Sequence, residues 1–590
     1  MITFSYSGFA QSITIINEVS REPVGNVALF NKSRDLATLS GPDGKANISI
    51  FKDNDSIFFQ HPSFNPAVFL KRDLHDGQQL FLSKRVILID EFVISATKSR
   101  ENKKNIPYMV DALDATGISE SLSQSSADLL LATGNIAVQK SQGGGGSPII
   151  RGFEANKILL VIDGVRMNNA IYRSGHLQNA ITIDNAILDR VEVIFGPTSL
   201  IYGSDALGGV IHYYTKDPVL AGDTGRYTFR ATAYTSYATA NTAKTGHLDF
   251  TNGFKNLGFL SSITYKDLGD IRMGRNKNPF YGDYGELLHY AARRNGRDTT
   301  LANPDPFLQL NTGYKQLDLL QKVKYTPSQY FDLILNLQYS TSSNIGRYDE
   351  LKNYSGDRMK YAEYYYGPQN RFFGSLKSVV KKHNFMFTNA TTTLAYQRID
   401  EDRITRKFGV DDKRYQLEDV DVYSLNVDML KLLRDDDRLN YGVEVTYNNV
   451  TSTARYRNII TGLQLPAETR YPDGGSYAAT SGLYLNYKFV PNANYILSAG
   501  ARYHYGLYHS EFIPGGILPY NNISINNGAL TGSLSMVYHP GKKWQINAIA
   551  SSGFRNPNID DYGKIRAKDG MVTVPNPDLK PEYSYNLELG

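Results

Sequence analysis

From about residue 225 onward, apolar and polar residues alternate along the chain with a period of two. In residues 330–340 one face would carry Phe331, Leu333, Leu335, Leu337 and Tyr339, and the opposite face Asp332, Asn336 and Gln338. In residues 494–506 one face would carry Tyr495, Leu497, Ala499, Ala501, Tyr503 and Tyr505, and the other Ser498, Arg502 and His504. This period predicts antiparallel β-strands with one apolar and one polar face, in a soluble sandwich or in a barrel.

The connections between these strands favour the barrel. Short turns are expected near residues 255–256, 327–328, 382–383, 435–437, 491–492 and 540–542. Long polar connections are expected at residues 268–312, 342–368, 401–414, 457–478, 508–527 and 556–582. Short periplasmic turns that alternate with long extracellular loops are typical of a transmembrane antiparallel β-barrel, and about fourteen strands fit before Gly590.

The residues before this alternating part have a different pattern. Residues 158–162 and 191–194 are short apolar runs bounded by Asp-Gly and Gly-Pro, which predicts two buried strands. Residues 180–188 have apolar positions at helical spacing, so a β-α-β-like unit is expected. Residues 114–133 are predicted to be largely helical, with Gly134 ending the helix. The sequence therefore predicts an α/β domain in front of the barrel.

The N-terminal part consists of short alternating segments separated by turn residues. This pattern predicts a small β-sandwich over residues 11–86. Residues 1–10 lack the basic start and the full apolar core of a secretory signal. Gly8 and Ala10 nevertheless precede Gln11 as small-residue cleavage sites require, so we expect the tail of a signal peptide there.

Five motifs within residues 147–218 carry a family resemblance. They are, in order, IRGF, VIDGV, DRVEVIFGP, LIYGSDALGGVI and TKDP. Together they resemble the plug domain of TonB-dependent outer-membrane receptors. The resemblance implies a plug over residues 105–218 and a barrel over residues 219–590. The N-terminal sandwich resembles the carboxypeptidase regulatory-like extension of some of these receptors, so the expected fold is mainly β: sandwich, α/β plug and transmembrane β-barrel.

A plug of about 120 residues needs a barrel of about 22 strands, which is more than the chain supplies. Residues 583–589 alternate as a strand and stop at Gly590, without the aromatic terminus that is usual in the family. We therefore expect a partial barrel that lacks its last third, about eight strands.

A candidate contact for an energy-transducing partner precedes the plug. Residues 89–98, IDEFVISATK, form a short β-prone run, and the charged linker 99–104 follows. An extended run beside a flexible segment suits strand addition to a partner's sheet. The resemblance implies that residues 87–104 are the TonB box and its linker, with TonB contacts at Glu91, Phe92, Val93, Ile94, Ser95, Ala96 and Thr97. A plain interdomain strand is the alternative.

Charged residues flank the predicted plug strands. They are Arg151, Arg166, Arg190 and Glu192. The resemblance implies salt bridges between such positions and the inside of the barrel wall, which would hold the plug reversibly. Solvated surface charge is the alternative.

In the family, substrates bind where the plug apices meet the extracellular loops. The matching positions are residues 142–147 and 170–178, and the candidate binding residues there are Gln142, Tyr172, Arg173 and His176. An arginine and a histidine beside aromatic side chains suit an anionic, partly aromatic ligand such as haem or a ferric siderophore. For the histidine, a solvated loop position is the alternative.

Two further motifs resemble boxes of haem and haemoglobin receptors. They are GFRNPN at residues 553–558 and NPDLKPE at residues 576–582, and the plug run VRMNNAIYR at residues 165–173 is similar as well. The stretch between the boxes has no histidine where the haem branch carries an axial ligand, and Tyr562 is the obvious replacement. Because similar boxes occur in siderophore receptors, haem and ferric siderophore both stay open.

Composition excludes some other functions. With 63 basic and 58 acidic residues the net charge is +5, which implies no nucleic-acid partner, and the lack of cysteine fits a periplasmic or surface location. Gly143 to Gly146 are followed by Ser-Pro rather than by the Gly-Lys-Ser/Thr of a phosphate-binding loop. No acid/base pair, nucleophile elbow or metal cluster stands out, so we expect neither an enzyme nor a permanently bound cofactor.

These inferences predict an outer-membrane receptor that imports an iron-containing ligand, with its N-terminal domain in the periplasm. The resemblance implies that a TonB-ExbB-ExbD complex supplies the energy, and it allows a surface lipoprotein as a further partner. One alternative is a SusC-like importer of glycans or peptides. Another is a surface barrel for adhesion or structure, without transport.

Overall fold

The computed structural model divides the chain into two compact units, residues 1–90 and 91–590, and each is described by itself. The structure describes residues 11–18, 20–83, 92–173, 179–222, 225–276, 278–434, 436–513, 521–541, 543–564, 566–568 and 571–590. The predicted signal-peptide remnant at residues 1–10 lies outside these ranges, as do Glu91 and His176.

The N-terminal unit contains two small sheets, with strand orders β4-β1-β7 and β3-β2-β5-β6. Their bounds are β1 Ser12–Asn17, β2 Ala28–Phe30, β3 Ala37–Leu39, β4 Lys45–Asn47, β5 Ser56–His61, β6 Phe64–Leu70 and β7 Gln79–Leu82, and a 3₁₀ turn, η1, spans Lys71–Asp73. One buried apolar cluster, which includes Ile15, Leu29 and Phe59, draws residues from both sheets. This is the small β-sandwich that the alternating segments predict.

The second unit begins with the plug, whose main sheet has the order β10-β16-β17-β14-β15. The plug strands are β10 Val110–Asp114, β11 Ala137–Gln139, β12 Ser147–Ile150, β13 Phe153–Glu154, β14 Ile158–Ile162, β15 Val165–Arg166, β16 Leu188–Phe195 and β17 Gly209–Thr215. The two strands predicted from residues 158–162 and 191–194 are present, but β17 lies between them. The glycine-rich segment after β16 returns the chain into the sheet, where β17 pairs with both neighbours.

The predicted plug helices are shorter than expected. Residues 180–188 form two 3₁₀ turns, η4 Asn179–Thr182 and η5 Asn185–Ile187, before β16 begins at Leu188. The single helix predicted for residues 114–133 is divided into α1 Ala115–Glu120 and α2 Ser126–Leu131. Asp114 caps the first through the Gly117 amide and Ser125 caps the second through the Asp128 amide. Both caps satisfy amide groups at a helix start, which explains the division.

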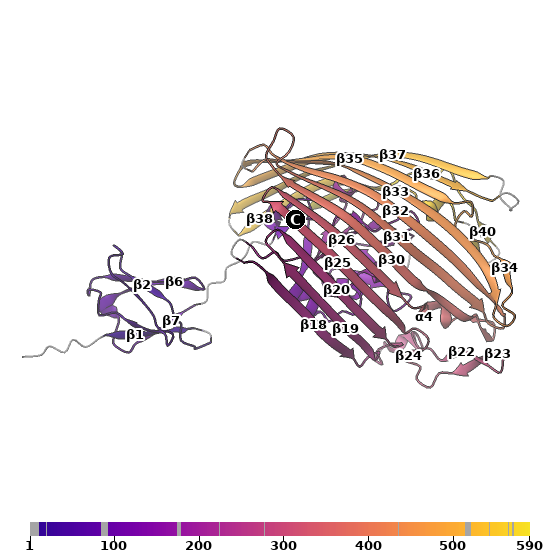
Figure 1. Cartoon of the computed structure of the whole chain (residues 1–590), viewed down its shortest axis with the longest axis horizontal. Helices are drawn as coiled ribbons and strands as arrows, with labels where there is room; N and C mark the ends of the chain where they lie inside the picture. The colour runs from indigo at the N-terminus through magenta and orange to yellow at the C-terminus, as the bar shows by residue number, and fades with distance from the viewer. Residues whose placement is uncertain are drawn as a thin grey trace, which may run out of the picture. The chain divides into compact units, whose positions relative to one another are not determined.

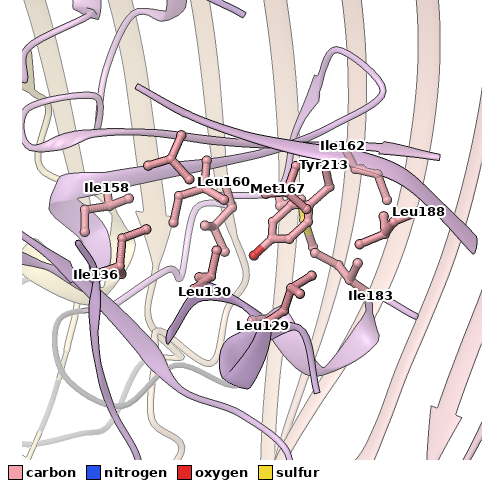
Figure 2. Close-up of a cluster of buried hydrophobic side chains, with 14 of the residues drawn as sticks. Leu129, Leu130, Ile136, Ile158, Leu160, Ile162, Met167, Ile183, Leu188 and Tyr213 are labelled. Carbon is pink, nitrogen blue, oxygen red and sulfur yellow. The ribbon is translucent and has the colours of Figure 1, made fainter. Parts of the chain in front are cut away.

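The plug core is a dry apolar layer between its sheet and its short helices. Leu129 and Leu130 of α2 lie on the opposite side of the cluster from Leu160 and Ile162 of β14 (Figure 2). Tyr213 of β17 is fully buried in the same cluster. Burial of these side chains makes the plug a folded body rather than a loose set of loops.

The rest of the unit is one large antiparallel sheet in which fourteen strands follow one another (Figure 1). In path order they are β18 Thr228–Ala238, β19 Ala243–Gly253, β20 Leu257–Leu268, β25 Tyr314–Ser328, β26 Phe331–Ser342, β30 Tyr361–Lys381, β31 Asn389–Lys407, β32 Asp412–Leu432, β33 Arg438–Asn458, β35 Ser476–Asn492, β36 Tyr495–Glu511, β37 Asn522–Gly541, β38 Trp544–Arg555 and β41 Glu582–Leu589. This matches the number of strands expected from the sequence, and the sheet curves around the plug.

The two faces of the sheet have the predicted polarity. Tyr503 on the outer face is 55% exposed, whereas Arg502 and His504 beside it are 1% exposed because they point toward the plug. Likewise, Tyr339 is exposed and Asn336 and Gln338 are buried. In the part of the chain that the structure describes, no helix is long and apolar enough to cross a membrane.

One connection predicted to be a long loop is instead a strand extension. β31 and β32 continue until only residues 408–411 connect them, whereas residues 512–521 still separate β36 from β37. The strands extend because their polar alternation continues past the apolar band, as at Arg403 and Gln416, which pair across the ladder.

The genuinely long connections carry small elements of their own. These are β21 Ile271–Arg272, η6 Pro279–Tyr281, β22 His289–Arg294, β23 Arg297–Ala302, β24 Leu308–Gln309, β27 Ile345–Gly346, α4 Tyr348–Leu351, β28 Tyr354–Ser355, β29 Arg358–Met359, β34 Gln464–Pro466, α5 Ile559–Tyr562, β39 Arg566–Lys568 and β40 Met571–Thr573.

Candidate functional site: the plug and its anchors

The predicted TonB box is folded against the plug. Phe92 and Val93 form β8, which pairs with β9, Glu101–Asn102, and the turn η2, Lys103–Asn105, follows. The segment 99–104, expected to be a flexible linker, thus contains the short second strand of a hairpin and the start of a 3₁₀ turn. Burial of Val93 and Ser95 explains why the box is folded onto the plug, since both residues are fully shielded from solvent.

Glu192 holds the backbone of this box. Its Oε2 accepts hydrogen bonds from the amides of Ile94 at 3.0 Å and Ser95 at 2.8 Å. Its Oε1 accepts one from the guanidinium Nε of Arg190 at 2.7 Å. A fully buried carboxylate is stable here because both oxygens have charged or amide donors.

The box hairpin is also anchored to the barrel wall, through residues that the sequence did not single out. Glu101 of β9 is buried and lies 3.0 Å from Arg438 and 2.8 Å from Lys488. Lys98 lies 2.9 Å from Asp428. The partners are more than three hundred residues apart in the chain, so no local pattern could pair them.

A hydrogen-bonded chain connects the box to the turn between β14 and β15. The hydroxyl of Tyr202 donates to the carbonyl oxygen of Ser95 at 2.8 Å and lies 3.3 Å from Nδ1 of His212. The His212 Nε2 accepts from the amide of Gly164 at 3.0 Å, which requires that nitrogen to be unprotonated. Burial, helped by Lys377, Arg190 and Lys98, holds the pKa of His212 well below its usual value.

Among the described residues, Arg151 is the one of the four predicted plug–barrel salt-bridge residues whose side chain pairs with a charged residue of the barrel. Arg151 binds Glu588 of β41 through two contacts of 2.8 and 3.0 Å. Arg166 instead donates to the carbonyl oxygen of Ser204 at 2.6 Å and lies 3.6 Å from Asp205, both in the plug.

Arg190 and Glu192 also differ from that expectation, because they pair with each other inside the plug. The reason is positional: both belong to β16, the second strand of the plug sheet, where Glu192 meets the box and Arg190 pairs with Glu192.

Other acidic residues connect the plug to the wall. Asp163, in the VIDGV motif, lies 3.5 Å from Lys322 and accepts a hydrogen bond from Asn336 at 2.8 Å. Burial raises the pKa of Asp163, but Lys322, Lys377 and hydrogen bonds from Thr215 outweigh it and lower the pKa overall. Asp184 is paired with Lys266 of β20 at 3.1 Å.

The glycine-rich loop at residues 143–146 lies against the barrel. A Cβ at Gly144 would be 2.2 Å from Ile181 and 2.8 Å from the Tyr314 hydroxyl of β25, so only glycine fits. Gln142 beside it is buried and accepts a hydrogen bond from the Ser141 hydroxyl.

The remaining predicted ligand contacts gather at a second point, near α5. Tyr172 is buried, and its hydroxyl has no hydrogen-bond partner among the described residues. Arg173 forms a buried ion pair with Glu401 of β31. Tyr562 of α5 is fully buried, with its hydroxyl 3.1 Å from that of Ser510.

Backbone contacts join this point to the box GFRNPN. The Asn558 side chain donates to the carbonyl oxygen of Tyr172 at 2.6 Å, and the amide of Ile559 donates to the carbonyl oxygen of Ala170 at 2.9 Å. Ligand binding by Gln142, Tyr172, Arg173, His176 and Tyr562 stays a prediction. Within the described ranges no three His, Asp or Glu side chains are grouped to hold a metal ion.

The plug is a folded domain inside a curved antiparallel sheet, and ion pairs tie it to that sheet. This arrangement defines the class of receptor in which a domain of the same chain closes the barrel. Residues 102–210 match the family model of the TonB-dependent receptor plug domain, and residues 297–590 match that of the TonB-dependent receptor-like β-barrel. The two matches together cover more than half of the chain. The chain belongs to the TonB-dependent receptors.

Similar proteins differ in what their names say they bind. A hemin receptor of Yersinia pestis is 30% identical over 196 residues, which is 32% of this chain and 27% of that receptor. The vitamin B12 transporter BtuB of Vibrio vulnificus is 23% identical over 513 residues, 85% of this chain and 67% of that protein. The solved structure of the copper transporter OprC has a TM-score of 0.63 at 15% identity, covering 82% of this chain and 68% of that one.

Proposed function

We propose that this protein is an active importer of an iron-containing ligand, either a ferric siderophore or haem. One observation carries the proposal: a box segment is held by Glu192 on the plug and, through the adjoining β9, by Arg438 and Lys488 on the wall. A plugged barrel needs work on its plug before solute passes. A short strand that is held by a few polar contacts is a segment that a partner protein could bind and pull.

The box segment must leave its present partners before another protein can bind it. β8 pairs with β9, and the amides of Ile94 and Ser95 are taken by Glu192. Strand addition needs free backbone groups, so release of the box precedes binding of an energy-transducing partner. A TonB-ExbB-ExbD complex would then pull the plug from the periplasmic side.

The location of this activity would be the bacterial outer membrane. The apolar outer face of the barrel would contact lipid, and the N-terminal sandwich would lie in the periplasm. A surface lipoprotein remains a proposed further partner, and no catalytic step is assigned to the protein.

The iron-containing ligand is supported by the hemin receptor similarity and by the two boxes around α5. That similarity covers about a third of the chain, so haem and ferric siderophore stand as equal candidates. The predicted ligand residues Tyr172 and Arg173 contact the first box through Asn558 and the barrel through Glu401.

Deletion of residues 91–97 tests the proposal. In a strain that relies on this protein for iron, uptake of radiolabelled iron from hemin or ferric citrate should fall to background. Binding of the same compound to whole cells should persist, because the deletion leaves the plug apex intact. Equal uptake by the deletion variant would exclude a TonB-driven importer, and an effect on vitamin B12 uptake alone would exclude iron as the cargo.

A further inference from the structure

Several guanidinium groups surround Tyr366 of β30 at the end of the barrel that carries the long loops. The Cζ atoms of Arg173, Arg347 and Arg403 lie 5.8, 5.3 and 5.7 Å from the centre of its ring. Arg347 also donates a hydrogen bond to the Tyr366 hydroxyl at 3.1 Å. The three arginines come from the plug, the connection before α4, and β31, and Arg347 is itself paired with Asp349, so the fold gathers charged groups from distant parts of the chain.

Two carboxylates of the barrel wall, Glu401 and Glu418, lie beside a fourth arginine, Arg470. Glu401 pairs with Arg173 and lies 3.8 Å from Arg470, and Glu418 lies 2.9 Å from Arg470. All four charged groups are buried, with Glu418 completely shielded. Buried ions of this kind persist only because each has an opposite charge as its partner.

The cluster is adjacent to the segment between the two boxes. Arg470 donates to the Tyr471 hydroxyl at 3.1 Å, and that hydroxyl donates to Asp560 of α5 at 2.8 Å. The same cluster therefore contacts the plug apex through Arg173, the barrel wall through Glu401 and the α5 segment through Asp560. A ligand that changed the partners of these arginines would act on all three at once.

We propose that this arginine cluster is a binding subsite for an iron compound that carries several carboxylates, and that Glu401 and Glu418 stand in for those carboxylates when no ligand is bound. Ligand carboxylates replace Glu401 as the partner of Arg173. The exchange removes one ion pair between the plug and the wall while the guanidinium stays paired. The inference rests on the proposed import function and names the chemistry of its cargo.

The exchange of Glu401 for a ligand carboxylate costs less free energy than loss of the ion pair alone. Breaking a buried ion pair by itself is costly, because it leaves an uncompensated charge. A carboxylate of the ligand restores a charge-assisted contact with the same guanidinium, and Glu401 keeps Arg470, 3.8 Å away, as its opposite charge, so part of that cost is offset. Because Glu401 competes with the ligand for Arg173, weakening that pair strengthens ligand binding, by at most the factor by which the pair is weakened.

Substitutions on the two sides of the pair should have opposite effects. Calorimetric titration of the protein in detergent micelles would use ferric citrate and hemin as carboxylate-bearing probes and ferrioxamine B as a cationic one. Arg173→Gln should weaken binding of a carboxylate probe by about tenfold or more, since a charge-assisted contact is lost. Glu401→Gln should strengthen it about threefold or more, since a competing carboxylate is removed.

The matched control is Glu444→Gln. Glu444 also forms a buried ion pair, with Arg502 at 3.1 Å, but it lies near the end of β33 that anchors the box. The Glu444→Gln variant should leave binding of the probes unchanged. Weaker or unchanged binding in Glu401→Gln would overturn the proposal and assign the pair a structural role only.

Two other outcomes separate this inference from the proposed function. Equal affinity for ferrioxamine B and ferric citrate would overturn the carboxylate subsite and leave iron import standing. No binding of any iron compound, together with no iron uptake by the wild-type protein, would overturn both. Preference for ferric citrate over hemin, or the reverse, identifies which carboxylate source the subsite accepts.

Discussion

At the scale of single residues, Glu192 holds the backbone of the predicted box. It makes the hydrogen bonds to the amides of Ile94 and Ser95 and pairs with Arg190. The sequence marked all of these residues but assigned Glu192 to the barrel wall, because a linear pattern does not reveal which face of β16 meets which neighbour. The buried carboxylate that holds the box became recognisable only when its donors were placed around it.

Loss of this carboxylate should loosen the box. The chain has no cysteine, and the hydroxyl of the buried Ser95 has no hydrogen-bond partner in the described part of the chain, so Ser95→Cys is a mild reporter. Adding Glu192→Ala should raise its rate of maleimide labelling about tenfold or more, because hydrogen bonds to a charged group contribute about 1.5–3 kcal/mol. Asp189→Ala on the same strand, which removes an exposed partner of Arg190, is the control. Equal labelling in all three proteins would contradict the role of Glu192.

His212 should make the stability of the plug depend on pH. The pKa of His212 in the folded plug lies well below the value of about 6.5 expected when unfolded. As pH falls below about 6.5, the unfolded state takes up a proton that the folded state does not. Stability is therefore highest above that pH and falls by up to about 1.4 kcal/mol per pH unit below it.

Thermal unfolding in detergent between pH 7.5 and 5 would measure this loss. His212→Gln should reduce the dependence on pH, whereas His383→Gln, at an exposed position, should keep it. An unchanged pH profile in His212→Gln would contradict the assignment.

At the scale of elements, α3 (Ser199–Tyr202) shows how closely the plug meets the wall. Gly203 ends this helix at φ +78°, and a Cβ there would lie 2.7 Å from the Arg502 guanidinium. The sequence indicated the glycine-rich turn through the LIYGSDALGGVI motif. It could not indicate the arginine, because Arg502 comes from β36, about three hundred residues later.

Gly203→Ala should therefore destabilise the plug more than backbone strain alone would. Gly164→Ala is the matched control, since Gly164 has φ +92° and open space at its Cβ position. Strain at a positive φ costs on the order of 1–3 kcal/mol in each variant, and Gly203→Ala adds the displacement of Arg502 from Glu444. Equal melting temperatures for the two variants would show that Arg502 moves without cost.

The strands predicted for the barrel, the plug and the sandwich are present, whereas the helix predicted for residues 180–188 was wrong. The barrel strands were found because apolar and polar residues that alternate over ten or more positions match the period of a strand and no helical period. Residues 180–188 were predicted as a helix, but the Asp184 carboxylate accepts from the Ala186 amide and from Thr264 on the wall, which favours a turn. Contacts with the barrel thus overrode the local apolar spacing.

At the scale of the whole molecule, the outer face of the sheet exposes large apolar and aromatic side chains. Tyr396, Tyr423, Tyr447 and Tyr477 form a row of neighbouring rings across four strands. Tyr487 and Phe489 mark the other end of β35. Aromatic residues at two levels with aliphatic ones between them are typical of a membrane-spanning barrel.

A charge placed between the two aromatic levels should separate a membrane barrel from a soluble sheet. Leu483, on β35, and Leu463, in a loop, are both 60% exposed. Leu483→Arg should cost about 2–4 kcal/mol in folding into lipid vesicles, because its charge would enter hydrocarbon. Leu463→Arg should cost little. Equal costs would contradict a lipid-facing sheet.

The proposed mechanism requires the box to leave its hairpin before the receptor can import its cargo. Phe92 and Asn102 are direct partners across β8 and β9, at a separation suited to a disulfide, and the chain has no other cysteine. In a strain carrying Phe92→Cys with Asn102→Cys, uptake of radiolabelled iron from its cargo should be abolished when the disulfide forms and regained after reduction. Wild-type uptake with the disulfide intact would contradict the account.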